Sequence, residues 1–254
     1  MGTAAITGSA SGIGAAVRKR LERDGDRVIG VDLRDAEVVA DLSSPEGRQR
    51  AIEAVCREAG GSLDRLVLCA GLGAHVDDLA MIASVNYFGV VELMDGLKGE
   101  LAGRPGAAAL AVCSNSAQFG RFEKHPFVLA LLEPNEAKAR RLVAKENGFI
   151  AYGGSKHALC RAVRGRAKAW GEAGVRLNGI CPGTTETPLL RGSIEHPVWG
   201  KGVADLDIPL GRWAEPEEMA AVIAFLLGPE AGYVHGSLVY VDGGTDATMQ
   251  PDRF

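Results

Sequence analysis

The 254-residue sequence lacks both an excess of positive charge and any long apolar run. It has 28 lysines and arginines against 32 aspartates and glutamates, so we expect no basic surface for nucleic acid or an anionic membrane. A membrane span needs about 18 consecutive apolar residues, and no such stretch is present. No basic segment followed by an apolar run opens the chain, so no secretory signal is expected.

Cysteine is scarce, and the histidines show no metal-ligand spacing. The five cysteines are odd in number, widely scattered and never form a CxxC pair. This pattern is typical of free thiols in a reducing compartment, so we expect a cytoplasmic protein. The five histidines form no ligand pattern, and no metal site is expected.

The sequence does contain an alternation of short apolar runs and longer helix-like stretches. Its 46% hydrophobic composition suffices for one ordinary core, and no linker divides residues 1–254, which predicts a single domain. Strands are predicted at 3–7, 27–31, 66–68, 109–113, 175–180 and 238–241. Helices are predicted at 12–23, 45–59, 77–101, 152–172 and 216–227. The alternation predicts an α/β fold, with a parallel sheet covered by helices on both faces.

Residues 118–147 interrupt this alternation ahead of the helix predicted at 152–172. They contain an apolar run that begins at Pro126 and then a charged run over 136–145. A structureless loop of this length is unusual inside a domain. We therefore predict a helical insertion, with one or two extra helices packed on the core.

A glycine-rich turn follows the first predicted strand and opens the first predicted helix. Gly8, Gly12 and Gly14 let the backbone turn tightly and approach a pyrophosphate, which the helix N-terminus would hold. Ser11 and Ile13 belong to the same predicted cofactor turn. Glycines also end strands for purely structural reasons, and that alternative stays open for the turn taken alone.

Asp32 stands at the tip of the second predicted strand, 18 residues after Gly14. A carboxylate there accepts hydrogen bonds from the adenosine ribose hydroxyls and repels a 2′-phosphate. We therefore predict NAD as the cofactor. Arg34 lies two residues on and would soften the discrimination, so NADP is less favoured but usable. The alternative is that Asp32 is only a surface acid at a strand end.

Tyr152 and Lys156 are four residues apart on a predicted helix, which places them on one face. A lysine ammonium and a positive nicotinamide ring would stabilise the phenolate. Tyr152 would then take a proton from an alcohol or give one to a carbonyl. Taken alone, the Tyr-x-x-x-Lys pattern is common by chance and usually marks a solvated helix face.

Several motifs together resemble the short-chain dehydrogenase/reductase family over essentially the whole chain. They are Thr-Gly-x-x-x-Gly-Ile-Gly at 7–14, Asn86, Ser114, Tyr152-x-x-x-Lys156, Pro-Gly-Thr-Thr-Glu-Thr at 182–187 and Val-Asp-Gly-Gly at 241–244. The resemblance implies a Rossmann-type, doubly wound sheet. It also implies a hydride-transfer site at the carboxyl ends of the strands.

The resemblance implies a role for each catalytic residue. Tyr152 corresponds to the acid/base and Ser114 to the serine that hydrogen-bonds the substrate oxygen, with Ser116 as a less favoured alternative. Lys156 resembles the lysine that tunes the tyrosine and holds the nicotinamide ribose. Asn86 resembles the asparagine that anchors a water of the proton relay. The alternative for Asn86 is a helix-interior side chain bonded to backbone.

Five more positions complete the implied cofactor site. Asp41 and Leu42 match the adenine contact, and Thr185 and Thr187 match the segment that grips the carboxamide and pyrophosphate. Gly71 keeps the backbone close to the cofactor. It ends Leu-Cys-Ala-Gly at 68–71, where many family members have Asn-Asn-Ala-Gly, and the lost asparagines put the support of the central strands in doubt.

The step of 38 residues from Ser114 to Tyr152 is longer than usual in the family, and residues 118–147 account for it. This insertion, with Leu-Val-Leu-Cys-Ala-Gly-Leu-Gly at 66–73, resembles the bacterial 3α-hydroxysteroid dehydrogenase/carbonyl reductase group. Coniferyl-alcohol dehydrogenases are the alternative. Both groups imply a bulky, apolar cyclic alcohol or ketone. In the first group the insertion obstructs the usual helix-bundle dimer face, so we predict a homodimer or homotetramer with a different interface.

Residues 188–212 alternate apolar side chains with glycines: Leu189, Leu190, Ile194, Val198, Trp199 and Leu206 with Gly192, Gly200 and Gly202. Two interpretations stay open, a mobile lid over a hydrophobic pocket or a surface helix that buries these side chains. Arg191 and Lys201 are the segment's obvious cations for a substrate carboxylate, and with so few a neutral substrate is favoured over a keto acid.

The alternative function from another class is a non-catalytic dinucleotide sensor or scaffold. The joint presence of the four predicted catalytic residues argues against it.

Overall fold

The computed structural model describes residues 2–133, 135–198 and 200–252, and a parallel sheet runs through them. Seven strands lie in the order β3-β2-β1-β4-β5-β6-β7, and each neighbouring pair is parallel. They are β1 (Thr3–Thr7), β2 (Arg27–Asp32), β3 (Val38–Val39), β4 (Arg65–Leu68), β5 (Ala108–Val112), β6 (Arg176–Pro182) and β7 (Leu238–Val241). The strand order reverses between β1 and β4, which opens a crevice at their carboxyl ends.

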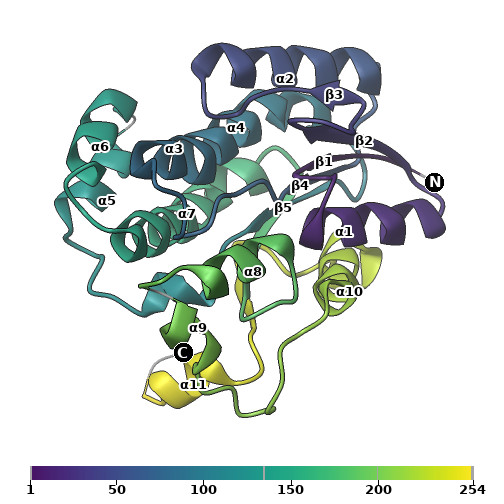
Figure 1. The fold of residues 1–254 in the computed structure, drawn as a ribbon. Coiled ribbons are helices and arrows are strands. Elements are labelled where there is room, and N and C mark those ends of the chain that lie inside the picture. The colour runs from purple at the N-terminus through teal and green to yellow at the C-terminus, as the bar shows by residue number, and fades with distance from the viewer. Residues whose placement is uncertain (1, 134, 199, 253–254) are drawn as a thin grey trace.

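Helices cover both faces of the sheet (Figure 1). On one face lie α1 (Gly12–Arg23) and α10 (Pro216–Leu227), and on the other lie α2 (Pro45–Ala59), α4 (Gly89–Leu101) and α7 (Gly148–Gly171). Both faces of the strands are therefore buried, which explains why β5 is an unbroken apolar run. The predicted α/β fold with a doubly wound sheet is confirmed.

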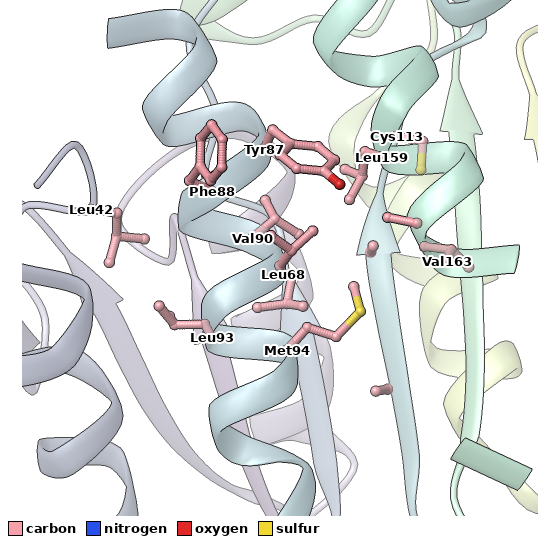
Figure 2. Close-up of a cluster of buried hydrophobic side chains, with 14 of the residues drawn as sticks. Leu42, Leu68, Tyr87, Phe88, Val90, Leu93, Met94, Cys113, Leu159 and Val163 are labelled. Atoms are coloured by element: carbon pink, nitrogen blue, oxygen red, sulfur yellow. The ribbon is translucent and has the colours of Figure 1, made fainter. Parts of the chain in front are cut away.

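The larger of the two cores lies beneath α4 and α7 (Figure 2). Leu68 of β4 and Met94 of α4 are fully buried there, and Leu159 of α7 packs against the same cluster. The rings of Tyr87 and Phe88 meet edge to face, with centroids 5.3 Å apart. Full burial of one such side chain contributes about 1.5–3 kcal/mol. This core gives α7, which carries Tyr152 and Lys156, a rigid support.

Two helices differ from their predicted bounds because side-chain caps set their ends. Asn147 accepts a hydrogen bond from the Ile150 amide, so α7 begins at Gly148 rather than at Tyr152. The helix predicted at 77–101 begins at Leu79 and is not α-helical throughout. Asp78 caps α3 (Leu79–Ala83), a π-helical turn follows at Ser84–Phe88, and α4 completes the stretch.

Short elements account for the remaining differences. The sequence analysis missed β3 and the C-terminal helix α11 (Thr245–Met249), because two or five residues are too few to show a period. Some strand ends also differ from the predicted ones. β2 extends through Asp32 instead of ending at 31, β5 ends at Val112 instead of 113, and β6 runs from Arg176 to Pro182 instead of 175–180. Ser114 therefore caps a 3₁₀ turn, Asn115–Gln118, instead of directly ending a strand.

The predicted insertion is helical. It contains α5 (Pro126–Leu132) and α6 (Glu136–Val143), which lie beside α7 and α3 at one flank of the molecule (Figure 1). Phe127 and Leu131 of α5 and Val143 of α6 are fully buried in the larger core. The two-helix form of the prediction is therefore confirmed, and the insertion is part of the core.

Two short helices, α8 (Pro188–Glu195) and α9 (Gly200–Ala204), follow β6. A 3₁₀ turn at Pro229–Ala231 follows α10. Across the described ranges, no helix combines the length and the apolar character that a bilayer crossing requires.

Candidate active site

A cavity of about 490 Å³ lies at the carboxyl edge of the sheet. The glycine turn between β1 and α1, the ends of β4, β5 and β6, and helices α7 and α8 all contribute to its wall. Most predicted site residues line it: Gly8, Ser11, Gly12, Ile13, Gly14, Gly71, Ser114, Tyr152, Lys156, Thr185 and Thr187. Residues from five distant stretches of the chain thus share one space.

The glycine turn has a backbone that only glycine adopts readily. Gly8 and Gly12 have φ values of +70° and +51°. A Cβ on Gly14 would lie 2.0 Å from the carbonyl oxygen of Gly8, so no larger residue fits there. Ser11 makes no side-chain hydrogen bond to the N-terminus of α1, which leaves that end of the helix without a side-chain cap. Such a terminus is suited to bind a pyrophosphate.

The acidic end of the predicted cofactor site lies beside this turn, outside the residues that line the cavity. The Asp32 carboxylate accepts hydrogen bonds from the Ala10 amide (3.0 Å) and the Leu33 amide (2.7 Å). These bonds hold the carboxylate next to the glycine turn, where an adenosine ribose would lie if the pyrophosphate occupied the turn.

Asp41 and Leu42 lie further along the same edge and do not line the cavity. Hydrogen bonds from the Ser43 hydroxyl and amide lower the pKa of Asp41, which therefore carries a charge in a local turn. Leu42 is buried, and its Cβ is close to Gly89 at the start of α4. The structure leaves their adenine contact a prediction.

Lys156 and Tyr152 share one face of α7. The Lys156 ammonium lies 5.9 Å from the centroid of the Tyr152 ring and donates a hydrogen bond to the Val112 carbonyl (2.8 Å). Lys156 is only 4% exposed, so its charge acts in a shielded place. The solvated-face alternative for this pair is wrong, because Lys156 is buried and Tyr152 faces the cavity.

Ser114 reaches the cavity from the turn after β5. Its Oγ accepts hydrogen bonds from the Ser116 amide (3.1 Å) and the Ser116 hydroxyl (2.9 Å). Because both bonds use lone pairs of Ser114, its own hydrogen can be donated to a substrate oxygen. Ser116 also lines the cavity, but it serves as a donor to Ser114.

Asn86 is fully buried in the π-helical turn and lies behind the cavity wall. Its Oδ1 accepts from the Leu72 amide (2.7 Å), and its Nδ2 donates to the Leu72 carbonyl (2.9 Å). Asn86 is thus bonded to backbone groups, as the alternative interpretation expected. These groups do not belong to its own helix, however, but to Leu72 in the loop after β4. Asn86 thereby holds Gly71 at the cavity, and its water-anchoring role stays a prediction.

Thr7 supplies the support that the missing asparagines put in doubt. Its Oγ1 accepts from the amides of Cys69 (3.0 Å) and Ala70 (3.1 Å), which ties the end of β1 to the end of β4. Burial raises the pKa of Cys69 to about 12, so its thiol is neutral. The loop is thus held by a hydroxyl on the neighbouring strand.

Comparison with known proteins settles the family. A family model described as "short chain dehydrogenase" matches residues 2–127, and one described as "Enoyl-(Acyl carrier protein) reductase" matches residues 136–246. The chain is 51% identical over 252 residues to 3-alpha-hydroxysteroid dehydrogenase/carbonyl reductase of Comamonas testosteroni, covering 98% of each protein. The chain belongs to the short-chain dehydrogenase/reductase family.

Two further relatives cover nearly all of this short-chain dehydrogenase. Coniferyl-alcohol dehydrogenase of Pseudomonas sp. (strain HR199 / DSM 7063) is 32% identical, with 96% of each chain covered. The crystal structure of the 3-alpha-hydroxysteroid dehydrogenase from Pseudomonas sp. B-0831 complexed with NADH superposes with a TM-score of 0.98. It is 45% identical, with 99% of this chain and 100% of that chain covered.

The sequence analysis of the short-chain dehydrogenase missed several parts of the cavity. Phe119, near the start of the insertion, and Phe149, in the first turn of α7 just after it, line the apolar side of the cavity together with Ala74. The apolar character of Phe119 and Phe149 was visible, but nothing in their spacing indicated that the insertion would end at the cavity. The Val112 carbonyl, which holds Lys156, carries no sequence signal because every residue has one.

The segment at 188–212 covers the cavity. Leu189, Leu190 and Leu206 line it, and Leu190 is also buried. Val198 is 67% exposed, and Trp199 lies outside the described residues. Of the two interpretations of this segment, the structure favours a cover over the pocket. It does not favour a surface helix that buries all its apolar residues in the core.

Proposed function

We propose that this short-chain dehydrogenase transfers a hydride between NAD and a secondary alcohol or ketone, with hydroxysteroids or other bulky apolar cyclic compounds as substrates. One observation carries the proposal: Ser114, Tyr152 and Lys156 line the same cavity as the glycine turn. The names of the relatives support the substrate class, and the NADH in a 45% identical structure supports the cofactor. On this proposal residues 1–254 act as one dinucleotide-binding catalytic domain.

The residues present fit a dinucleotide. The uncapped N-terminus of α1 suits the pyrophosphate, and Asp32 beside it suits ribose hydroxyls without a 2′-phosphate. Thr185 and Thr187, which line the same cavity, would hold the nicotinamide end. When bound, NAD supplies the hydride acceptor, and the protein supplies placement and electrostatics.

The roles of the protein's own groups follow from their contacts. Ser114 donates its hydrogen to the substrate oxygen and holds it near Tyr152. Tyr152 takes the hydroxyl proton in oxidation and returns it in reduction. Lys156, fixed by the Val112 carbonyl, stabilises the phenolate with its positive charge. Asn86 acts behind them by holding the Leu72 backbone and, we propose, a water of the proton path.

The character of the cavity favours a neutral, apolar substrate. Phe119, Phe149, Leu189 and Leu206 supply apolar wall. Arg191 points its charge to Glu186 in a surface ion pair of 2.8 Å and is not among the lining residues. Among the described lining residues the cation is Lys156, whose ammonium is already bonded to the Val112 carbonyl. A substrate carboxylate would therefore lack a dedicated cation, whereas fused or single rings would bury apolar surface.

Turnover of a defined panel tests this proposal. NADH consumption is followed with cyclic ketones, and NAD reduction is followed with hydroxysteroids, terpenoid alcohols and aryl alcohols. Activity on a 3-ketosteroid or a 3α-hydroxysteroid is the expected result. Activity confined to aryl or terpenoid alcohols would instead favour the coniferyl-type alternative, which the 32% identical relative supports. NADH binding without any turnover would favour the sensor or scaffold.

We further propose that the chain assembles as a homodimer or homotetramer with a non-standard interface. The insertion supports this, because α5 packs along α7 and thereby occupies space beside the helix that a helix-bundle interface would use. A solution-scattering envelope that fits the usual four-helix interface would contradict it. The cytoplasm is the proposed compartment, since all five cysteines are free thiols.

A further inference from the structure

His75 belongs to the loop after β4 and points its ring toward helix α8. The ring lies close to two glycines, Gly73 of the loop and Gly192 of α8. A Cβ on Gly73 would lie 2.7 Å from its Nδ1, and a Cβ on Gly192 would lie 2.7 Å from its Nε2. Real side chains do not approach so closely, so a Cβ at either position would force the ring to move. The imidazole therefore fills the space between two segments that are 119 residues apart.

A hydrogen bond adds direction to this packing. His75 Nδ1 lies 3.1 Å from Ser193 Oγ, and the Ser193 hydroxyl donates its hydrogen to the Leu189 carbonyl (2.9 Å). The proton shared with His75 must then come from Nδ1. Burial lowers the pKa of His75, and the neighbouring charge of His196 lowers it further. This favours the neutral ring, in which Nδ1–H is the donor. Ser193 is itself 8% exposed, so the contact is shielded from water.

The two ends of this contact belong to different parts of the cavity wall. On one side, Leu72 is fixed to the buried Asn86 by two hydrogen bonds, so the loop that carries His75 is anchored to the core. On the other side, α8 presents Leu189, Leu190 and Ser193 to the cavity. The His75 contact is therefore a link between the anchored cofactor wall and the cover of the substrate space.

We propose that His75 is a specificity-determining positioning residue, which docks α8 on the loop after β4 and so sets the roof of the substrate cavity. This inference rests on the proposed function and names a determinant of its substrate size. A multi-ring substrate buries more apolar surface against Leu189 and Leu190 than a single ring does, so it depends more on where α8 lies.

The test compares a 3-ketosteroid with cyclohexanone in the wild type and in Ser193→Ala. Loss of the hydrogen bond is expected to raise KM for the steroid roughly 3- to 10-fold. The effect on the steroid KM is expected to exceed the effects on kcat, on the Kd for NADH and on the KM for cyclohexanone by at least about threefold. His75→Asn, whose amide nitrogen can replace Nδ1, should keep more of the steroid preference than His75→Ala does. Asp77→Ala, in the exposed part of the same loop, is the matched control and should resemble the wild type.

A double-mutant cycle tests the packing independently. Gly192→Ala would force a Cβ against the ring and raise the steroid KM, and this effect should disappear in a His75→Ala background. Equal effects of Gly192→Ala in both backgrounds, or an unchanged steroid preference in Ser193→Ala, would overturn the role of His75.

Failure of the proposed function would be seen separately, as a wild type that turns over neither ketone. Docking of α8 is then measured by trypsin cleavage after Arg191, whose side chain is 71% exposed. Faster cleavage in Ser193→Ala than in the wild type and in Asp77→Ala would support the docking. Equal rates in all three would overturn it.

Discussion

At the scale of single residues, backbone groups hold the polar side chains of the site in place. The Val112 carbonyl fixes Lys156, the Leu72 peptide groups fix Asn86, and the Ser116 amide contributes to fixing Ser114. Because these partners belong to strand ends and turns, the side chains are oriented before a ligand binds. Such preorganisation is what proton transfer between positioned groups requires.

Tyr152→Phe removes the proposed acid/base and leaves the ring. Turnover should fall by roughly 10²- to 10⁴-fold, while the Kd for NADH stays within a few-fold of the wild type. Steady-state rates and NADH fluorescence titration measure the two effects. Tyr233→Phe, on a fully exposed tyrosine, is the control and should keep full activity. A near-normal rate in Tyr152→Phe would remove the assignment.

Asp32→Ala removes the carboxylate that would oppose a 2′-phosphate. The ratio of kcat/KM with NAD to that with NADP should fall by about tenfold or more, because NAD loses hydrogen bonds and NADP loses a repulsion. The variant also frees the Ala10 and Leu33 amides that now bind Asp32. Asp35→Ala, on a side chain that is 83% exposed, should leave the ratio unchanged. An unmoved ratio in Asp32→Ala would exclude Asp32 as the selector.

At the scale of elements, the insertion is joined to the body through a buried arginine. Arg48 of α2 is 1% exposed and bonds Glu136 of α6 (2.5 Å) and Glu92 of α4 (2.6 Å). Burial opposes the charge of Arg48, but the two carboxylates outweigh it and raise the pKa of Arg48. Glu136 also accepts from Ser84 (2.6 Å), the first residue of the π-helical turn that carries Asn86. The insertion thus contacts the elements that position the site.

Glu136→Gln should destabilise the protein because it leaves the buried Arg48 with less opposite charge. The expected loss is about 1–3 kcal/mol in the free energy of unfolding, since Glu92 and the Leu42 carbonyl still bond Arg48. Urea denaturation measures it. Glu133→Gln, which breaks only the exposed pair with Lys138, should change stability by less than about 0.5 kcal/mol. Equal losses in the two variants would contradict the buried network.

At the scale of the whole molecule, charged contacts also tie the sheet together at the edge opposite the cavity. Asp64, just before β4, accepts from the Thr3 amide of β1 (2.7 Å) and from Arg104 (2.9 Å). Burial alone would raise the pKa of Asp64, but the Thr3 amide and the Arg104 guanidinium lower it below its ordinary value of 3.8. Asp64 therefore favours the folded state when it is charged.

Asp64→Asn should lower stability at neutral pH by about 1 kcal/mol, because the contact is partly exposed to solvent. A carboxyl with a lowered folded pKa contributes stability that is fully present above its ordinary value of 3.8. This stability is lost as the pH falls through the lowered value. The gap between wild type and variant should therefore close below pH 3.8, which thermal melts from pH 7 to pH 2.5 would measure. A gap that persists at the lowest pH would contradict the electrostatic origin.

The sequence by itself determined the sheet apart from β3, the chemistry and their order along the chain. Unbroken apolar runs, the glycine turn at 7–14 and the spacing of Tyr152 and Lys156 are local patterns, and each reflects a local physical requirement. Period 2 or 3.6, a positive φ and a shared helix face are all set within a few residues. The resemblance then combined these patterns into one family, which the comparisons confirmed.

Only the tertiary structure decided which groups hold the site residues. Asn86 meets Leu72, Glu136 meets Arg48, and His75 meets Ser193, although each pair is separated by at least 14 residues. A backbone carbonyl, or a glycine that leaves room for a ring, has no recognisable pattern in the sequence. Its role could not be predicted, because a contact between distant segments depends on how every element between them is packed.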